Sequence, residues 1–404
     1  MSLHNKTYIK RPYYLKKALP FLDKNLIKVF TGQRRTGKSY LMLQLMDEIL
    51  ELKPEAQIVF IDKELMKFDF IKTSQDLMDY LNKVIELDKR TYLFIDEVQE
   101  IDGFEKVLRS IVNEGRADIW CSGSNADILT GELADKLSGR YIEIRVHSLS
   151  FLEFLQFHSM ENDNRSLYSY LKYGGLPNLI DLSLEDNIAF DYLKTINATV
   201  LLKDIIKRHQ IRNVAMLENL IRFMADNTGS LFSANSISKF LKSQGQKISA
   251  SIISNYISYI LDAYYLIKVP RSDLQGKRIF ETNEKYYFED VGLRNAWIGY
   301  QPMHINKLIE NVVFRHIFEQ GYNITVGSIG SKEIDFVTEK DGNKIYIQCA
   351  YLIADEKTRE REFGNLLKIK NNFRKMVVSM DEPSGGNIDG IEHMHLRVFL
   401  STIF

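Results

Sequence analysis

The first third of the chain alternates between two patterns of apolar residues. Short runs that are almost wholly apolar and rich in β-branched and aromatic side chains are typical of strands buried on both faces. Such runs occupy residues 25–30, 57–62, 91–96, 117–122 and 141–146. Apolar residues at helical spacing occupy residues 38–51, 74–88 and 103–115. Strands that alternate with helices predict an α/β fold with a parallel sheet covered by helices on both faces.

Helical spacing dominates the middle of the chain. Residues 148 to about 228 are predicted to be helical, with a turn at Tyr-Gly-Gly-Leu-Pro. Beyond them we predict two helices joined by a turn, and then short strands. The ranges are 234–242 and 249–262 for the helices, and 264–270, 278–282 and 286–289 for the strands. This order is typical of a winged helix-turn-helix, which can contact DNA or serve only for packing and protein contact.

Basic residues flank the second of these helices and could contact phosphates. They include Lys242, Lys247, Arg271, Lys277 and Arg278. The last hundred residues predict a further small α/β unit, with a helix opened by Ile309-Glu310-Asn311 and strands at 332–336 and 344–350. We therefore predict three domains, at residues 1–147, 148–300 and 301–404.

Composition is ordinary for a soluble globular protein. The 404 residues are 45% hydrophobic, and 53 basic residues balance 53 acidic ones, so any contact with nucleic acid must be a local patch. The basic N-terminus has no apolar run behind it, and no stretch of about 18 uncharged apolar residues could span a bilayer. The two cysteines, Cys121 and Cys349, are predicted to be buried thiols in a reducing compartment. The cytoplasm is the expected location.

A phosphate-binding loop follows the first predicted strand. Residues 32–39 fit G-x-x-x-x-G-K-[ST], and the predicted helix begins directly after the loop. Its residues are Gly32, Gln33, Arg34, Arg35, Thr36, Gly37, Lys38 and Ser39. The glycines allow the backbone to approach the phosphates, Lys38 can reach the β- and γ-phosphates, and Ser39 can ligate Mg²⁺. We predict nucleotide contacts along the whole loop and onward to Tyr40.

Two carboxylates end the third predicted strand. Asp96 and Glu97 follow four apolar residues, and ligands of open α/β sheets bind at the carboxyl ends of the strands. We expect Asp96 to hold the Mg²⁺ shell and Glu97 to orient and deprotonate the attacking water.

Polar residues after the fourth strand and before the fifth complete the candidate site. Ser124 and Asn125 could each sense the γ-phosphate, with Asn125 slightly favoured, although Ser and Asn are also common in ordinary turns. Arg140 could project into a neighbouring subunit's nucleotide and stabilise the transition state. A structural salt bridge for Arg140 is equally compatible with the sequence.

These stretches resemble the Walker A, Walker B and sensor-1 motifs of an AAA+-type ATPase. The segments TGQRRTGKS, LFIDEVQE, CSGSN, LSGRYIEI with LSFLEF, and YGGLP occur in the order seen in one bacterial and archaeal family. Its members join an AAA+-like P-loop ATPase to a winged-helix segment and a C-terminal restriction-endonuclease-like domain of uncertain function. The resemblance implies ATP rather than GTP, a partner that is nucleic acid or protein, and a chain that could form homo-oligomers.

The C-terminal part resembles the PD-(D/E)xK nuclease core, in which acidic residues and a lysine hold a metal and activate water. Asp335 and Glu310 would match, but Gln348 replaces the second acid and Ala350 replaces the lysine. We therefore expect a degenerate domain that does not cut.

The leading functional hypothesis is an Mg²⁺-dependent ATPase that acts as a switch or motor. The alternatives are a nucleotide-gated DNA- or protein-binding module with little turnover, and an ATP-dependent nuclease.

Overall fold

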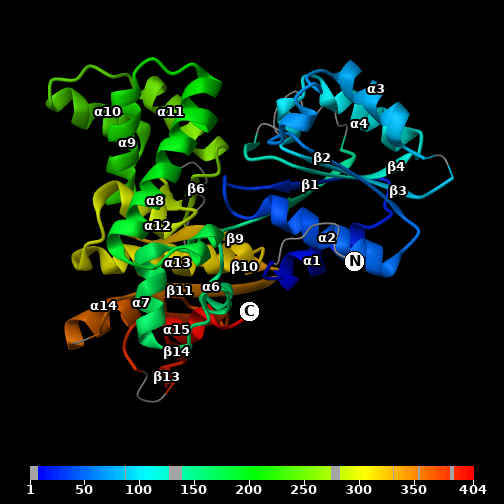
Figure 1. Cartoon of the computed structure of the whole chain (residues 1–404). Coiled ribbons are helices and arrows are strands. Elements are labelled where there is room, and N and C mark those ends of the chain that lie inside the picture. The colour runs from blue at the N-terminus through cyan, green and yellow to red at the C-terminus, as the bar shows by residue number, and fades with distance from the viewer. Residues whose placement is uncertain are drawn as a thin grey trace. The chain divides into compact units, whose positions relative to one another are not determined.

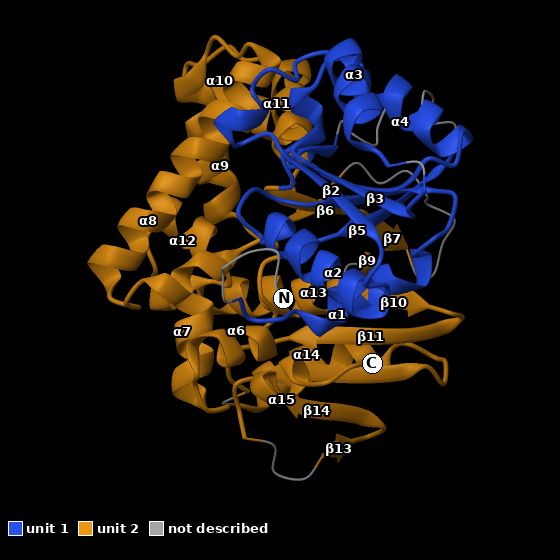
Figure 2. Cartoon of the chain, turned by 45° about the vertical axis from the view of Figure 1, so that its right-hand side comes forward, with its two compact units in different colours: residues 1–147, 262–264 blue, residues 148–261, 265–404 orange. Residues whose placement is uncertain are grey.

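The computed structural model describes residues 8–86, 88–126, 139–273, 283–330, 332–353, 355–382 and 386–404 (Figure 1). The chain divides into two compact units, coloured separately in Figure 2. Unit 1 comprises residues 1–147 and 262–264, and unit 2 comprises residues 148–261 and 265–404. Among the helices of the described residues, none has the length and apolar character needed to cross a membrane.

A five-stranded parallel sheet forms the centre of unit 1. Its strand order is β2-β3-β4-β1-β5. The strands are β1 (Ile27–Thr31), β2 (Gln57–Asp62), β3 (Thr91–Asp96), β4 (Ala117–Ser122) and β5 (Tyr141–Arg145). All neighbouring pairs run parallel. The prediction of a P-loop-type α/β sheet is confirmed.

Helices cover both faces of this sheet, as Figure 1 shows. They are α1 (Pro12–Ala18), α2 (Lys38–Leu52), α3 (Ser74–Val84) and α4 (Phe104–Asn113), with short turns η1 (Leu19–Phe21), η2 (Met66–Phe68) and η3 (Val98–Glu100). Strand residues pack in alternation, so that Ile95 and Cys121 join the core under α3 and α4, while Phe94 and Trp120 join the core under α1 and α2. Strands buried on both faces explain the almost wholly apolar runs in the sequence.

Helix α3 is shorter than predicted. It begins with a capping box between Thr73 and Asp76, but it ends at Val84 rather than at residue 88. Ile85 turns to an extended conformation and buries its side chain in the core. Burial of one apolar side chain therefore ends the helix before its polar continuation.

A short distant segment also belongs to unit 1. Tyr264 has a left-handed backbone (φ +53°) and donates a hydrogen bond from its hydroxyl to Glu143 on β5, at 3.3 Å. The Arg145 guanidinium lies over the same ring, 4.7 Å from its centroid. The predicted strand at 264–270 is therefore wrong at its first residue.

Helices occupy the first half of unit 2, as predicted. They are α6 (Phe151–His158), α7 (Asn164–Tyr173), η5 (Pro177–Asp181), α8 (Asp186–Thr199), the π-helical η6 (Val200–Lys207), α9 (Val214–Asp226), α10 (Ala234–Ser243) and α11 (Ala250–Asp262). After them, β6 (Leu266–Val269) pairs antiparallel with β8 (Lys285–Phe288). The predicted strand at 278–282, with Lys277 and Arg278, lies outside the described residues. The winged helix stays a prediction.

A seven-stranded mixed sheet forms the rest of unit 2. Its order is β13-β14-β12-β11-β10-β9-β7. The strands are β7 (Arg271–Asp273), β9 (Asn323–Ile329), β10 (Lys332–Lys340), β11 (Asn343–Cys349), β12 (Arg374–Ser379), β13 (Asn387–Ile388) and β14 (Ile391–His395). The predicted strand at 264–270 is thus also wrong at its end, because Pro270 separates β6 from β7, which pairs with β9.

Helices cover both faces of the mixed sheet. They are α13 (Ile305–Glu319), α14 (Glu356–Leu367) and α15 (Leu396–Leu400). Helix α12 (Val291–Ile298), which packs against α7, α8 and α9, and the short η7 (Pro302–His304) precede them in the chain. Side chains of α13 and α15 pack on one face, and Phe363 and Leu366 of α14 pack on the other. The helix predicted to open at Ile309 begins at Ile305, so Glu310 lies in its second turn. The division of the chain into three domains stays a prediction.

Candidate functional site: a phosphate loop beside two carboxylates

The loop after β1 requires glycine at its first position. Gly32 has φ +133°, and a Cβ added there would lie 2.1 Å from the carbonyl oxygen of Val146. The chain after β5 therefore runs so close to the loop that no side chain fits. Val146 also donates its N–H to the carbonyl oxygen of Thr31, at 2.8 Å, which fixes this close approach.

Helix α2 starts at the end of the loop without a side-chain cap. Its N-cap is Gly37, at φ +94°, and no side chain caps the helix. The first N–H groups of a helix lack partners within the helix and carry partial positive charge, so they attract anions. The sequence of strand, glycine loop and helix thus builds an anion cradle.

Side chains brace the loop from within. Lys38 donates from Nζ to the carbonyl oxygens of Gly32 (2.9 Å) and Gln33 (3.0 Å). Arg11 donates from Nη1 to the carbonyl oxygen of Thr36, at 2.9 Å, and lies buried beneath the loop. The Lys38 ammonium therefore lies within the loop, where a phosphate would have to meet it.

Gln33 carries an orphaned amide in this loop. Its side chain is 1% exposed, and within the described part of the chain neither amide atom has a hydrogen-bond partner. A buried polar group without a partner is unfavourable by about 1–3 kcal/mol. An unsatisfied amide beside a helix N-terminus that no side chain caps fits a loop built to hold a polar ligand.

Asp96 is the last residue of β3, which neighbours β4 in the sheet. Burial raises its pKa to about 6, while hydrogen bonds from Ser122 and Ser39 act in the opposite direction. Ser122 donates from Oγ to Asp96 Oδ1 and accepts the N–H of Glu97, at 3.0 Å. The Ser39 hydroxyl and the Asp96 carboxylate are therefore neighbours, as a shared Mg²⁺ would require.

The pKa of Glu97 is shifted in the opposite direction to that of Asp96. Burial alone would raise its pKa, but Lys38 and Arg34, with hydrogen bonds from Gln99 and Ser124, hold the pKa below its ordinary value. The backbone of Glu97 is left-handed, with φ +53°, which ends β3 and sets the direction of the side chain. A buried, ionised carboxylate beside the loop can accept a proton from water.

The two sensor candidates lie at the end of β4, and both are buried. Ser124 donates from Oγ to Glu97 Oε2 at 3.0 Å. The sequence did not identify Ser122 as a site residue, because its position beside Asp96 follows only from the register of the sheet. Ile95 lies opposite Cys121, so the next residues along, Asp96 and Ser122, meet at the carboxyl edge.

Of the remaining predicted residues, Arg140 lies apart from this cluster and Tyr40 follows the loop directly. Arg140 precedes β5, and β5 runs parallel to β1, so Arg140 lies at the opposite end of the sheet from the loop. It is exposed and donates to the side chain of Asn113 on α4. Residues 137 and 138 before it lie outside the described residues. Tyr40 is 42% exposed on the first turn of α2.

The residues named from the nuclease-like pattern also come together in unit 2. A pocket of about 380 Å³ is lined by Asn306, Glu310, Asp335, Gln348, Cys349, Ala350, Tyr351, Leu352, Arg361 and Glu362. Asp335 accepts the N–H of Cys349 at 2.9 Å, and Gln348 accepts the N–H of Asp335 at 3.4 Å. Within the described residues, no group of three or more His, Cys, Asp or Glu side chains is arranged to hold a metal ion.

A lysine from another part of the chain supplies the positive charge beside this pocket. Lys285 on β8 lies 2.7 Å from Glu310, 2.7 Å from Glu333 and 3.4 Å from Asp335. Burial alone would lower its pKa, but these carboxylates raise it. Burial also raises the pKa of Glu310 to about 7. Ala350 stands at the lysine position of the nuclease pattern, and a positive charge from a residue distant in sequence lies beside these carboxylates instead.

Comparisons with known proteins agree with the sheet and the loop. Residues 24–155 match a family described as AAA domain, and residues 164–304 match a domain of unknown function, DUF8612. An uncharacterised protein of Haemophilus influenzae is 35% identical over 400 residues, which cover 97% of this chain and 98% of that protein. An uncharacterised protein of Methanocaldococcus jannaschii is 28% identical and covers 89% of this chain and 83% of its own length.

Similar solved structures are more distant. The Aeropyrum pernix ORC1 protein in complex with DNA is 12% identical with a TM-score of 0.33, covering 72% of this chain and 92% of that one. The Thermotoga maritima RuvB Holliday junction branch migration motor is 16% identical with a TM-score of 0.34, covering 65% and 90%. Likeness at these scores says nothing about activity.

Proposed function

Since the chain belongs to the same family as the uncharacterised Haemophilus influenzae protein and carries an AAA domain, we propose that it is an Mg²⁺-dependent ATPase. We further propose that hydrolysis makes it a switch or motor for a nucleic-acid or protein partner. The observation that carries the proposal is the placement of two buried carboxylates, Asp96 and Glu97, beside a phosphate loop that contains Lys38.

The loop residues would bind the triphosphate. The N–H groups at the start of α2 face the loop, and Lys38 needs only to exchange two backbone carbonyls for phosphate oxygens. Anionic oxygens are stronger acceptors for an ammonium than neutral carbonyls are. Residues 32–39 and Tyr40 would therefore form the nucleotide contacts, with ATP as the nucleotide.

Ser39 and Asp96 would hold Mg²⁺, which supplies charge neutralisation at the β- and γ-phosphates when it is bound. Their hydrogen bond joins the loop to β3. Ser122 keeps the Asp96 carboxylate in place through its own hydrogen bond. A hydroxyl and a carboxylate are oxygen ligands of the kind that Mg²⁺ prefers.

Glu97 would act as the general base. Ser124 and Gln99 both donate to its carboxylate, and Lys38 lowers its pKa, so it is ionised at neutral pH. It can take a proton from a water molecule that attacks the γ-phosphate. Asn125 would orient the γ-phosphate or that water.

Phosphate release from MgATP tests the proposal. We expect the wild type to turn over, and Glu97→Gln to bind ATP with unchanged affinity while hydrolysing it about 10²–10⁴-fold more slowly. Glu100→Gln is the matched control, because Glu100 is an exposed carboxylate in the same short turn, η3. Absence of turnover in the wild type, with and without DNA, would overturn the proposal.

Measurements of partner affinity distinguish an ATPase switch or motor from a nucleotide-gated binding module with little turnover. In Glu97→Gln, which should retain ATP, partner affinity that changes with ATP would favour nucleotide gating by binding alone. Dependence on hydrolysis in the wild type would favour a motor. We also propose a cytoplasmic location, and homo-oligomers in which Arg140 could reach a neighbour's nucleotide.

We propose that the C-terminal nuclease-like part does not cut DNA. The Lys285 ammonium already pairs with Glu310, Glu333 and Asp335, which weakens the attraction of these carboxylates for a divalent cation. Plasmid DNA should remain intact after long incubation with the protein in Mg²⁺ or Mn²⁺. Cutting that disappears in Asp335→Ala would instead establish an active nuclease.

A further inference from the structure

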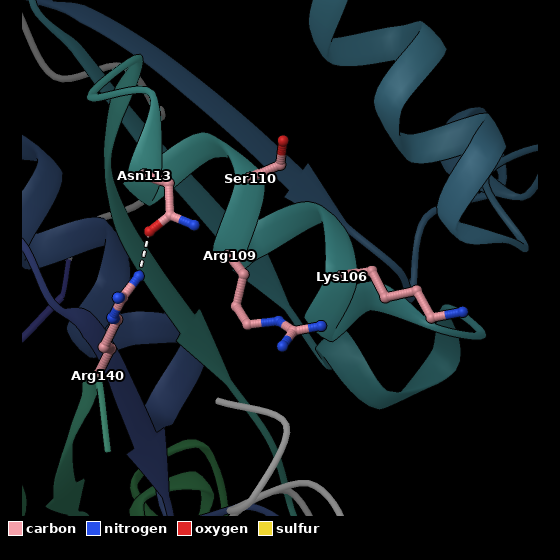
Figure 3. A pocket seen from close by; sticks show the side chains of 5 residues that line it. All are labelled: Lys106, Arg109, Ser110, Asn113 and Arg140. Carbon is pink, nitrogen blue, oxygen red and sulfur yellow. Dashed lines mark hydrogen bonds between the residues drawn. The ribbon is translucent and has the colours of Figure 1, made fainter. Parts of the chain in front are cut away.

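One side of α4 forms a pocket with the residue before β5. The pocket has a volume of about 430 Å³ and is lined by Lys106, Arg109, Ser110, Asn113 and Arg140 (Figure 3). The four α4 residues are spaced by three, four and seven positions, so they lie along one side of the helix. Figure 3 shows Arg140 reaching toward Asn113 from the strand side.

The lining is cationic and wholly polar. Lys106, Arg109 and Arg140 contribute three positive charges, and no carboxylate lines the pocket. In the portion of the chain that the structure describes, none of the three makes an ion pair. The nearby Glu114 is engaged by Ser110 and by Arg116, the latter at 3.5 Å. Since the whole chain has a net charge of zero, this is a local excess of charge.

Two of the cations, Arg109 and Arg140, are placed so that they could bind a hydrogen-bond acceptor in the pocket. The Arg109 Nε is buried and has no hydrogen-bond partner among the described residues. Asn113 accepts a hydrogen bond from Arg140 through Oδ1, which orients the guanidinium over the pocket. Orienting a long cation and leaving a donor unsatisfied are both unfavourable unless an anionic ligand compensates for them.

We propose that this pocket binds phosphodiester groups of a nucleic-acid backbone, an inference that rests on the proposed ATPase function and names its partner. Guanidinium groups match the geometry of phosphate oxygens. From Lys106 to Asn113 the helix rises about 10 Å, which corresponds to about three nucleotides of one strand at about 3.4 Å each. Protein partners usually need apolar or aromatic anchors, and the lining offers none.

The pocket is connected to the carboxylates through a short stretch of chain. Glu97 is followed directly by η3, and α4 begins at Phe104 after Gly103, which is left-handed at φ +72°. A nucleic-acid strand bound along α4 could therefore shift the segment between α4 and β3, which positions Glu97. Binding should change the rate of ATP hydrolysis as well as hold the nucleic acid.

The full-length protein without nucleotide is titrated with fluorescent single-stranded and duplex oligonucleotides. Lys106→Ala/Arg109→Ala should weaken binding at least tenfold. It should also reduce the slope of log affinity against log salt by about 1.4 for a single strand, for two lost phosphate contacts. The matched control is Lys72→Ala/Lys83→Ala, which removes two exposed lysines of unit 1 and should change affinity less than twofold.

Four outcomes would overturn the inference. The first is wild-type protein that binds neither oligonucleotide, and the second is an equal loss of affinity in the pocket and control variants. The third is displacement of the oligonucleotide by polyglutamate as effectively as by unlabelled DNA, which would indicate a protein partner. The fourth is displacement by inorganic phosphate beyond that by chloride at equal ionic strength, which would indicate a site for free phosphate. Lys106→Ala alone, at an exposed position, keeps the test valid if the double variant fails to fold.

ATP turnover is measured separately. If the wild type binds the oligonucleotide through the pocket but never hydrolyses ATP, the proposed ATPase function is refuted and nucleic-acid binding by the pocket is supported. If the wild type hydrolyses ATP, and oligonucleotides neither bind nor alter the rate, nucleic-acid binding by the pocket is refuted and the ATPase function is supported.

Discussion

At the scale of single residues, two serines at the end of β4 serve different carboxylates. Ser122 holds Asp96, and Ser124 donates to Glu97 at 3.0 Å. We expect Ser122→Ala to weaken the Mg²⁺-dependent part of ATP binding about tenfold, since a hydrogen bond to a charged group contributes about 1.5–3 kcal/mol. Ser124→Ala should slow turnover by a similar factor and leave ATP affinity unchanged. Calorimetric titration and phosphate release measure the two effects.

Each serine variant is the control for the other, because both lose one buried hydroxyl at or just after the end of β4. Identical changes in affinity and rate for the two would contradict the division of roles.

The protonation of Asp96 should make ATP binding in Mg²⁺ depend on pH. Burial raises its pKa to about 6, so the carboxylate gains a proton below pH 6, and that proton competes with Mg²⁺. We expect ATP affinity in Mg²⁺ to fall as pH falls from 7 to 5, by up to about tenfold per unit below 6. Titration of labelled ATP in Mg²⁺ and in EDTA checks this. Affinity in EDTA, and the affinity of Asp96→Asn, should depend much less on pH, and a parallel decline in all three would refute the role of Asp96.

At the scale of elements, a pair of glycine variants tests the close contact between the phosphate loop and the residue that follows β5, Val146. Gly32→Ala places a methyl group 2.1 Å from Val146 and also forces a left-handed backbone, whereas Gly115→Ala forces only the backbone, at φ +67° with open space. The second change should reduce stability by about 1–2 kcal/mol. Gly32→Ala should reduce it further and abolish ATP binding. Melting curves and ATP titrations of both variants give the comparison, and equal effects would show that the contact with Val146 is unimportant.

The contribution of the buried Lys285 on β8 to stability can be compared with that of an exposed lysine on the neighbouring strand, β6. Lys285→Met leaves three carboxylates without their counter-charge and should reduce the stability of unit 2 by about 3–5 kcal/mol. Lys268→Met on β6 removes an exposed lysine that pairs with Glu284 at 3.1 Å, and should change stability by less than about 1 kcal/mol. Denaturant unfolding measures both. Adding Glu310→Gln to Lys285→Met should restore part of the loss, and no restoration would argue against a charge effect.

The elements differ in how well their sequence predicts them. The strands of unit 1 lie within two residues of the predicted ranges, because burial on both faces demands apolar runs such as Leu93–Ile95. The loop was predictable because its glycines and Lys38 serve local geometry. Lys285 was not, since its partners Glu310 and Asp335 lie far along the chain and no local pattern shows that β8 brings them together. Ser122 required the register of the sheet, which the strand pattern alone does not supply.

At the scale of the whole molecule, acid should destabilise unit 2 through His316 on α13. Burial lowers the pKa of His316 from 6.5 to about 4, and its Nε2 lies 2.8 Å from the carbonyl oxygen of Thr402. Between pH 6.5 and 4 the unfolded chain binds a proton there and the folded chain does not, so stability falls as pH falls. The slope from this residue is at most about 1.4 kcal/mol per pH unit.

Unfolding of the wild type and His316→Gln across this range tests the effect. The variant should be less stable at pH 7.5 and should lose less stability on acidification. Parallel curves would show that His316 is not held neutral by the fold.

The assignment of residues 262–264 to unit 1 bears on how such a chain can be inherited. Tyr264 binds Glu143 and lies beneath Arg145, so β5 is completed by residues encoded more than a hundred codons downstream of it. A recombination event with a single breakpoint after residue 147 would bring in a foreign partner for β5 along with the new second half. The ATPase part therefore cannot be exchanged as a simple cassette, and the two halves should be transmitted together. The Haemophilus influenzae relative, which matches 97% of the chain from end to end, has the continuity that such linkage predicts.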